Sequence, residues 1–140
     1  MKAGAMLAAM AGRAIAAQVV INTLGIRSLG VGALIGVSGL ATAAAGFAVA
    51  LFARPELPGR AMLYGVTSGL LGAVILAAIV VAAGRAGLAQ TLSLVIASQL
   101  LAGLLIDRTG LFGQAAADFG GLKVLGVVLV LVGDVLVVRG

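Results

Sequence analysis

The sequence predicts an all-α membrane protein, and three observations lead to this fold class. Of the 140 residues, 63% are hydrophobic and only 9% are charged, and the mean hydropathy is +1.30. A soluble domain is about 45–50% apolar and about 25% charged, and a small one leaves much of its surface wet. The apolar runs are also too long and too uniform for the alternating strands of a β-barrel. We therefore expect membrane lipid, and no nucleic acid, around this chain.

Five apolar runs have the length of a membrane-spanning helix, which needs about 20 residues. Most charged residues lie between the runs, as expected for loops at a membrane surface. We predict a single transmembrane domain, residues 1–140, in which a five-helix bundle is formed by Ala3–Leu24, Val31–Ala53, Ala61–Ala83, Leu88–Ile106 and Leu122–Val138.

Turn-forming residues justify each boundary in order. Gly25 and Gly30 bracket a short connection after the first run, and both prolines lie in the connection 54–60 after the second. The stretch 84–87 begins and ends with glycine and separates the third run from the fourth. The longest connection, Asp107–Gly121, precedes the last run. Lys2 with the apolar residues after it also resembles a cleavable signal peptide, but the run continues past Arg13, so we expect it to be retained.

The missing residue types restrict the chemistry. There is no Cys and no His, and Asp and Glu total four. Thiolate and imidazole ligands and the usual proton shuttle near neutral pH are therefore absent. We expect no metal site, no cofactor and no enzymatic activity.

Three amides lie inside the apolar runs. Gln18 and Asn22 are four residues apart and so share one face of the first helix, and Gln99 lies near the middle of the fourth. An amide left without a partner in hydrocarbon costs several kcal/mol, so these faces should point inward. The amides could bond to neighbouring helices, or they could line a polar cavity that binds a small-molecule substrate.

Three charged residues lie within or at the ends of the runs. Arg13 is close to the centre of the first, where a charge costs at least about 2.5–3.5 kcal/mol. It could pair with Asp134, extend its side chain to the interface, or attract an anion in a cavity. Asp107 ends the fourth helix, where a negative charge opposes the helix dipole, so it needs a partner, and Arg108 is one candidate. Asp107 and Asp134 are the carboxylates available for proton coupling.

The residues in two helices resemble a known family. The stretch 12–25 carries Gln18, Asn22 and then Leu24-Gly25, and the stretch 98–110 carries Gln99 and later Asp107. This pattern is similar to that of the YdcZ-type small membrane proteins of the drug/metabolite transporter superfamily, over essentially the whole chain. The resemblance implies a transporter-like five-helix unit in a bacterial cytoplasmic (inner) membrane, and it implies no particular substrate.

Two departures separate the chain from that pattern. Ser98 replaces the usual glycine, and Arg13 stands where the family has an apolar or small residue. The small multidrug resistance proteins have four helices and a carboxylate in the first. The first helix here has no acid, so their proton–drug exchange cannot be carried over.

The odd helix count bears on the mechanism. Five helices cannot contain their own inverted repeat, and many transporters need two inverted halves around a central site. Five Lys/Arg on the N-terminal side against three on the other give only a weak orientation signal. We therefore expect half of a ten-helix inverted-repeat transporter: a dual-topology secondary transporter that exports a small metabolite by alternating access. It would act as an antiparallel homodimer or with an oppositely oriented paralogue. The alternatives are a small dual-topology ion channel and a non-transporting membrane subunit.

Overall fold

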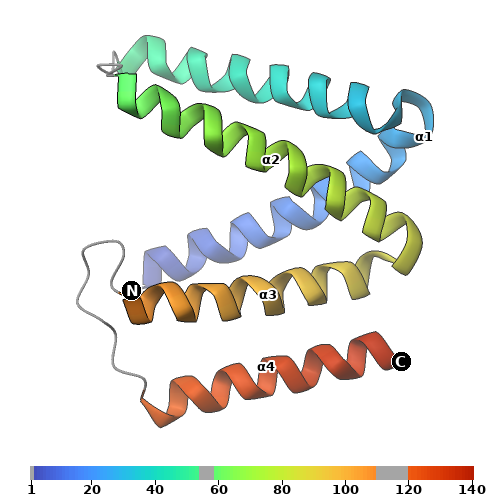
Figure 1. Ribbon diagram of the computed structural model, residues 1–140, viewed down its shortest axis with the longest axis vertical. Coiled ribbons are helices and arrows are strands. Elements are labelled where there is room, and N and C mark those ends of the chain that lie inside the picture. Colours follow the sequence, from blue (N-terminus) through green and yellow to red (C-terminus); the bar gives the residue numbers. More distant parts are fainter. Residues whose placement is uncertain (1, 54–58, 110–119) are drawn as a thin grey trace. The chain divides into compact units, whose positions relative to one another are not determined.

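The computed structural model describes residues 2–53, 59–109 and 120–140, which form four helices and no strand. The prediction of an all-helical membrane protein is confirmed, because every helix is long and apolar enough to cross a bilayer. The predicted connections 54–58 and 110–119 lie outside the described residues. In chain order the elements are α1 (Lys2–Ala53), α2 (Gly59–Ala86), α3 (Leu88–Thr109) and α4 (Gly121–Arg139) (Figure 1).

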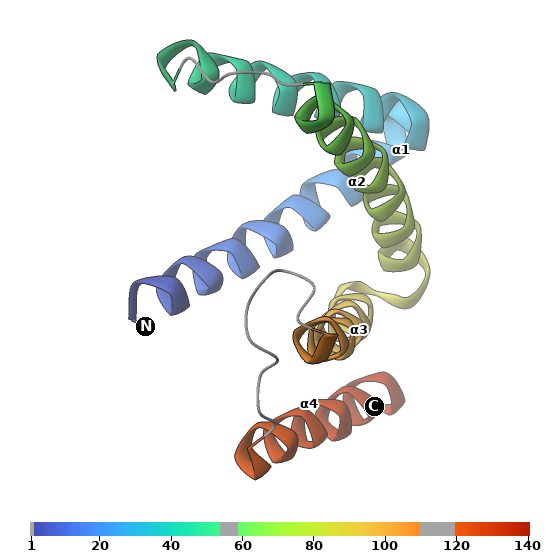
Figure 2. The ribbon, with the colours of Figure 1, turned by 60° about the vertical axis from the view of Figure 1, so that its left-hand side comes forward.

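A break at Gly30 divides α1 into two arms. A straight helix of 52 residues would be about 78 Å long, more than twice the roughly 30 Å of a hydrocarbon core. Gly30 has φ 72° and ψ 165°, a backbone conformation that is essentially restricted to glycine. Figures 1 and 2 show that the chain doubles back at this point. Each arm, residues 2–29 and 31–53, has the length of one membrane crossing.

The helices continue past the ends expected from the sequence. The first arm runs to residue 29 rather than ending at Leu24, and α2 runs to Ala86 rather than Ala83. Polar residues near these ends are compatible with a helix, and the Ser28 hydroxyl donates to the Gly25 carbonyl within the arm, at 3.3 Å. A positive-φ glycine marks each break: Gly30 in α1 and Gly87, at φ 87°, between α2 and α3.

The chain divides into two compact units, Met1–Arg85 and Ala86–Gly140. In the first unit the two arms of α1 approach closely at Gly25, where an added Cβ would lie 3.0 Å from Leu34 Cδ1. The buried residues of this unit are Val19, Asn22, Leu34, Val80 and Ala83.

The second unit is a helical hairpin in which α3 packs against α4 (Figure 2). Its buried residues are Thr91, Ala97 and Val127. Large apolar side chains are exposed along both units, among them Leu40 at 73% and Leu122 at 86%. Such a surface suits lipid rather than water.

Candidate functional site

Polar contacts join α3 to α4 at both ends of the hairpin. Near the start of α3, Gln90 Nε2 donates to the Val138 carbonyl at 3.0 Å. That carbonyl is among the last four of α4, which have no donor within their own helix, so Gln90 caps α4. At the other end, Lys123 Nζ lies 3.2 Å from Asp107 Oδ2. These contacts fix the two helices as antiparallel and set their register.

Asp134 is held by a hydroxyl from the facing helix. The Ser93 hydroxyl donates to Asp134 Oδ1, and both side chains are half-buried. Asp134 lies five residues before Arg139, the end of α4, which places it about 7.5 Å along the helix from that end. A hydrogen bond to an ionised carboxylate is stronger than one between neutral groups, so Ser93 offsets part of the cost of a charge at this depth.

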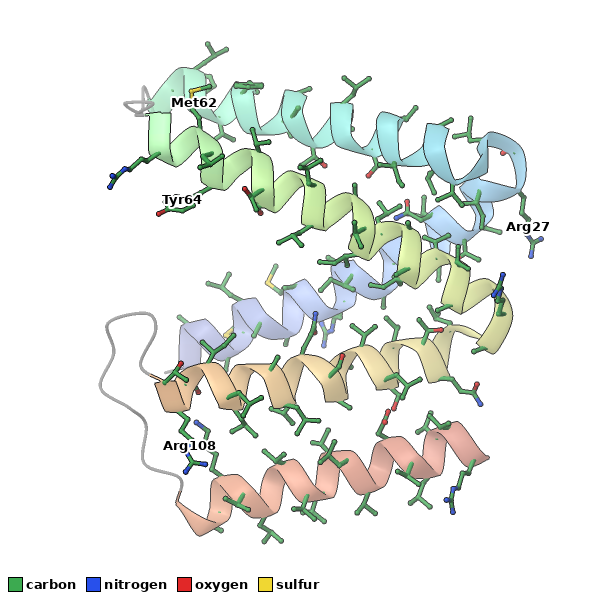
Figure 3. The ribbon with its side chains drawn as sticks, in the orientation of Figure 1. Arg27, Met62, Tyr64 and Arg108 are labelled. Carbon is green, nitrogen blue, oxygen red and sulfur yellow. The ribbon has the colours of Figure 1, made fainter. Side chains whose placement is uncertain are left out.

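Asp107 has the partner that its position predicts, and that partner is Lys123. Their side chains are 53% and 41% exposed, respectively. A cation beside a carboxylate at the end of α3 offsets the unfavourable helix dipole there. The sequence suggested Arg108 as one candidate, but Arg108 projects from the last turns of α3 (Figure 3), and the salt bridge in the structure is formed by Lys123.

The three amides have different exposures. Gln99 is exposed at the middle of α3, about 9 Å along the axis from Ser93. Gln18 is also exposed, whereas Asn22, one turn further on, is buried at 7% exposure. Gln18 therefore lies at the edge of the face that buries Asn22. Gln18 and Asn22 belong to the first unit and Gln99 to the second, so a common cavity stays a prediction.

Arg13 is the one cation among the described residues that lies well inside a helix. It is exposed near the middle of the first arm. The other basic residues lie near helix ends or breaks, as Arg27 does beside the turn of α1 (Figure 3). Arg13 and Asp134 belong to different units, and their pairing stays a prediction.

Other features of the described residues add no second site. They contain no group of three or more His, Cys, Asp or Glu that could hold a metal ion. A hollow of about 350 Å³ on α3 is lined by Leu101, Leu104, Leu105 and Arg108. Because none of the three amides lines it, this hollow differs from the predicted amide cavity.

Ser93 and Gln90 were not among the residues singled out from the sequence. A signal was present in the topology. In two antiparallel helices, residues that are equally far along the chain from the connection lie opposite each other. Ser93 and Asp134 are at similar distances from the connection that begins at Asp107, so they are expected to face each other.

The long apolar helices of the fold define a class, the multi-pass helical membrane proteins. The family described as "Putative inner membrane exporter, YdcZ" matches residues 3–136. The chain belongs to this family, as the motifs around Gln18, Asn22 and Gln99 suggested. Searches of curated proteins and of solved structures give no match.

Proposed function

We propose that this protein is one half of a small-metabolite exporter that works by alternating access as an antiparallel dimer. The observation that carries the proposal is the break at Gly30. Four helices in the described part of the chain have membrane-spanning length. The break divides the longest of them, α1, into two arms, and we take each arm as one crossing, which makes five crossings. Five crossings place the two ends of the chain on opposite sides of the membrane. A second chain in the opposite orientation then supplies the inverted half that such transporters use.

The exposed amides support a cavity that a second chain completes. Gln99 lies in the middle of an apolar helix, with its side chain exposed. Facing lipid, its amide would cost several kcal/mol, so water, a substrate or a second chain covers it. Gln18 has the same requirement and would line the approach to the cavity, with Asn22 one turn further on in the same helix. Amides donate and accept hydrogen bonds without changing charge, which suits a small polar or partly apolar solute.

The orientation of the chain is tested with single cysteines, since the native chain has none. Ser28→Cys lies beside the Gly30 break and Gly59→Cys at the start of α2, on opposite sides of the membrane in a five-crossing chain. We expect a membrane-impermeant thiol reagent to label each from both sides. Ala44→Cys, in the middle of the second arm, is the control and should stay unlabelled. Labelling of Ser28→Cys from one side only, with no paralogue expressed, would refute the antiparallel homodimer.

Transport is tested by the metabolites that cells release. Mass spectrometry of the medium should show a solute enriched by the wild-type protein and reduced by Gln99→Ala or Gln18→Ala. Ser98→Ala is the matched control, because its hydroxyl donates to the Val95 carbonyl of its own helix, at 2.9 Å. If both amide variants insert, dimerise and export like wild type, the amides only pack and the cavity lies elsewhere. Release at the rate of a pore would indicate a channel instead.

A further inference from the structure

We propose that Asp134 is the group that binds and releases the proton driving this export, and that Ser93 is its positioning residue. The proposal rests on the exporter function and names its coupling ion. It stands on the contact between α3 and α4, in which the Ser93 hydroxyl donates to Asp134 Oδ1.

The two acids within the described residues have different surroundings. Asp107 is ion-paired with Lys123 at the end of the hairpin, and its side chain is 53% exposed. A carboxylate that is already neutralised by a cation gains little by taking up a proton. Asp134 is half-buried among the apolar residues of α4, and its partner is a neutral hydroxyl. Of the two acids, Asp134 is therefore the one whose partner in the described part of the hairpin is a hydroxyl rather than a cation.

The charged groups of α3, the helix packed against α4, lie far from Asp134. They are Asp107 and Arg108, and Asp107 is about 21 Å along α3 from Ser93. Within α4, Lys123 is about 16 Å along the axis from Asp134 and Arg139 about 7.5 Å beyond it. Within the described part of this hairpin, no cation neutralises Asp134. The Arg13 pairing considered from the sequence is the alternative, since a carboxylate held by an arginine would keep its charge.

The proton balance of the step is simple. A proton from water on one side of the membrane adds to the Asp134 carboxylate, and the side chain becomes neutral. Burying a neutral carboxyl costs far less than burying a carboxylate, so the hairpin can change its surroundings in this form. Deprotonation to water on the other side restores the charge. The Ser93 hydroxyl donates to the carboxylate again, so each Asp134 that completes the step carries one proton inward.

The first test needs no substrate. The purified dimer in lipid is titrated from mildly acidic to mildly alkaline pH while the infrared band of the protonated carboxyl group is recorded. We expect a band that disappears with rising pH in wild type and Asp107→Asn and is absent from Asp134→Asn. Ser93→Ala should shift the pH midpoint at which the band disappears, and Ser93→Thr should restore the wild-type midpoint. Ser98→Ala should leave the midpoint unchanged. If wild type shows no Asp134-dependent band, the proposal is wrong.

The second test uses the solute identified in the release experiment, loaded into proteoliposomes. An inward proton gradient should accelerate wild-type efflux, whereas Asp134→Asn should keep solute exchange and lose the response to the gradient. A response retained in Asp134→Asn would overturn the proposal, as would a response that requires Na⁺ instead. If wild type exports nothing, the exporter function fails, while the infrared titration still decides whether Asp134 exchanges a proton.

Discussion

Replacing Gly30 by alanine tests the feature on which the topology depends. At φ 72° and ψ 165°, a residue with a side chain is strained by about 1–3 kcal/mol. Alanine could avoid this strain if α1 straightened, but a helix of about 78 Å does not fit a bilayer. The strain therefore persists in the folded protein, and we expect Gly30→Ala to lower the free energy of unfolding by about 1–3 kcal/mol.

Gly32→Ala is the matched control for this substitution. Gly32 lies two residues further along in regular helix, and a Cβ there would meet nothing within 4 Å. Alanine is a better helix former than glycine by roughly 0.5–1 kcal/mol, so the control should be as stable as wild type or more so. The assay is reversible unfolding in mixed detergent and lipid, followed by circular dichroism. Equal stability of Gly30→Ala and Gly32→Ala would refute the reasoning.

Three further predictions concern contacts within the hairpin, in α1, and between the charges of the spans. Asp107→Asn should reduce the free energy of unfolding by less than about 1 kcal/mol, because the ion pair of Asp107 with Lys123 is exposed. A larger loss in the same unfolding assay would show that the pair is buried. Gly25→Leu should cost about 1–3 kcal/mol by overpacking against Leu34, and an unchanged melting temperature would contradict the close approach of the arms. If Ser93 is the partner of Asp134, the losses of unfolding free energy caused by Arg13→Gln and Asp134→Asn should add to within about 0.5 kcal/mol in the double variant. Recovery of stability in the double variant would instead reveal an ion pair between Arg13 and Asp134.

Hydropathy predicted long apolar helices, but it did not predict where they end. Leu24 is the last residue of an apolar run, yet the first arm continues through Arg27 and Ser28 to residue 29. A change in composition marks where the chain meets water, whereas a helix ends where the backbone conformation changes. That change occurs at Gly30 and Gly87, and the sequence offered other glycines that remain helical, such as Gly25 and Gly84.

The candidate site was predictable in composition and not in its contacts. The sequence placed Asp134 within the last apolar run, as a possible partner of Arg13 or a carboxylate for proton coupling. Its contact with Ser93 joins residues 41 positions apart, and no local pattern connects them. Asp107 needed a partner because of the helix dipole, but the choice of Lys123 over the adjacent Arg108 depends on the register of the hairpin.

The lengths of the helices make the protein sensitive to bilayer thickness. The 28 residues of α2 extend about 42 Å, whereas the 19 residues of α4 extend about 29 Å, close to the roughly 30 Å hydrocarbon core. A long helix adapts to a thicker membrane by tilting less, whereas α4 is only about as long as the core is thick and cannot adapt in this way. Arg139 would then extend toward the interface, and Asp134 would lie farther from water. The lipid composition of the membrane thus sets how far this carboxylate lies from water.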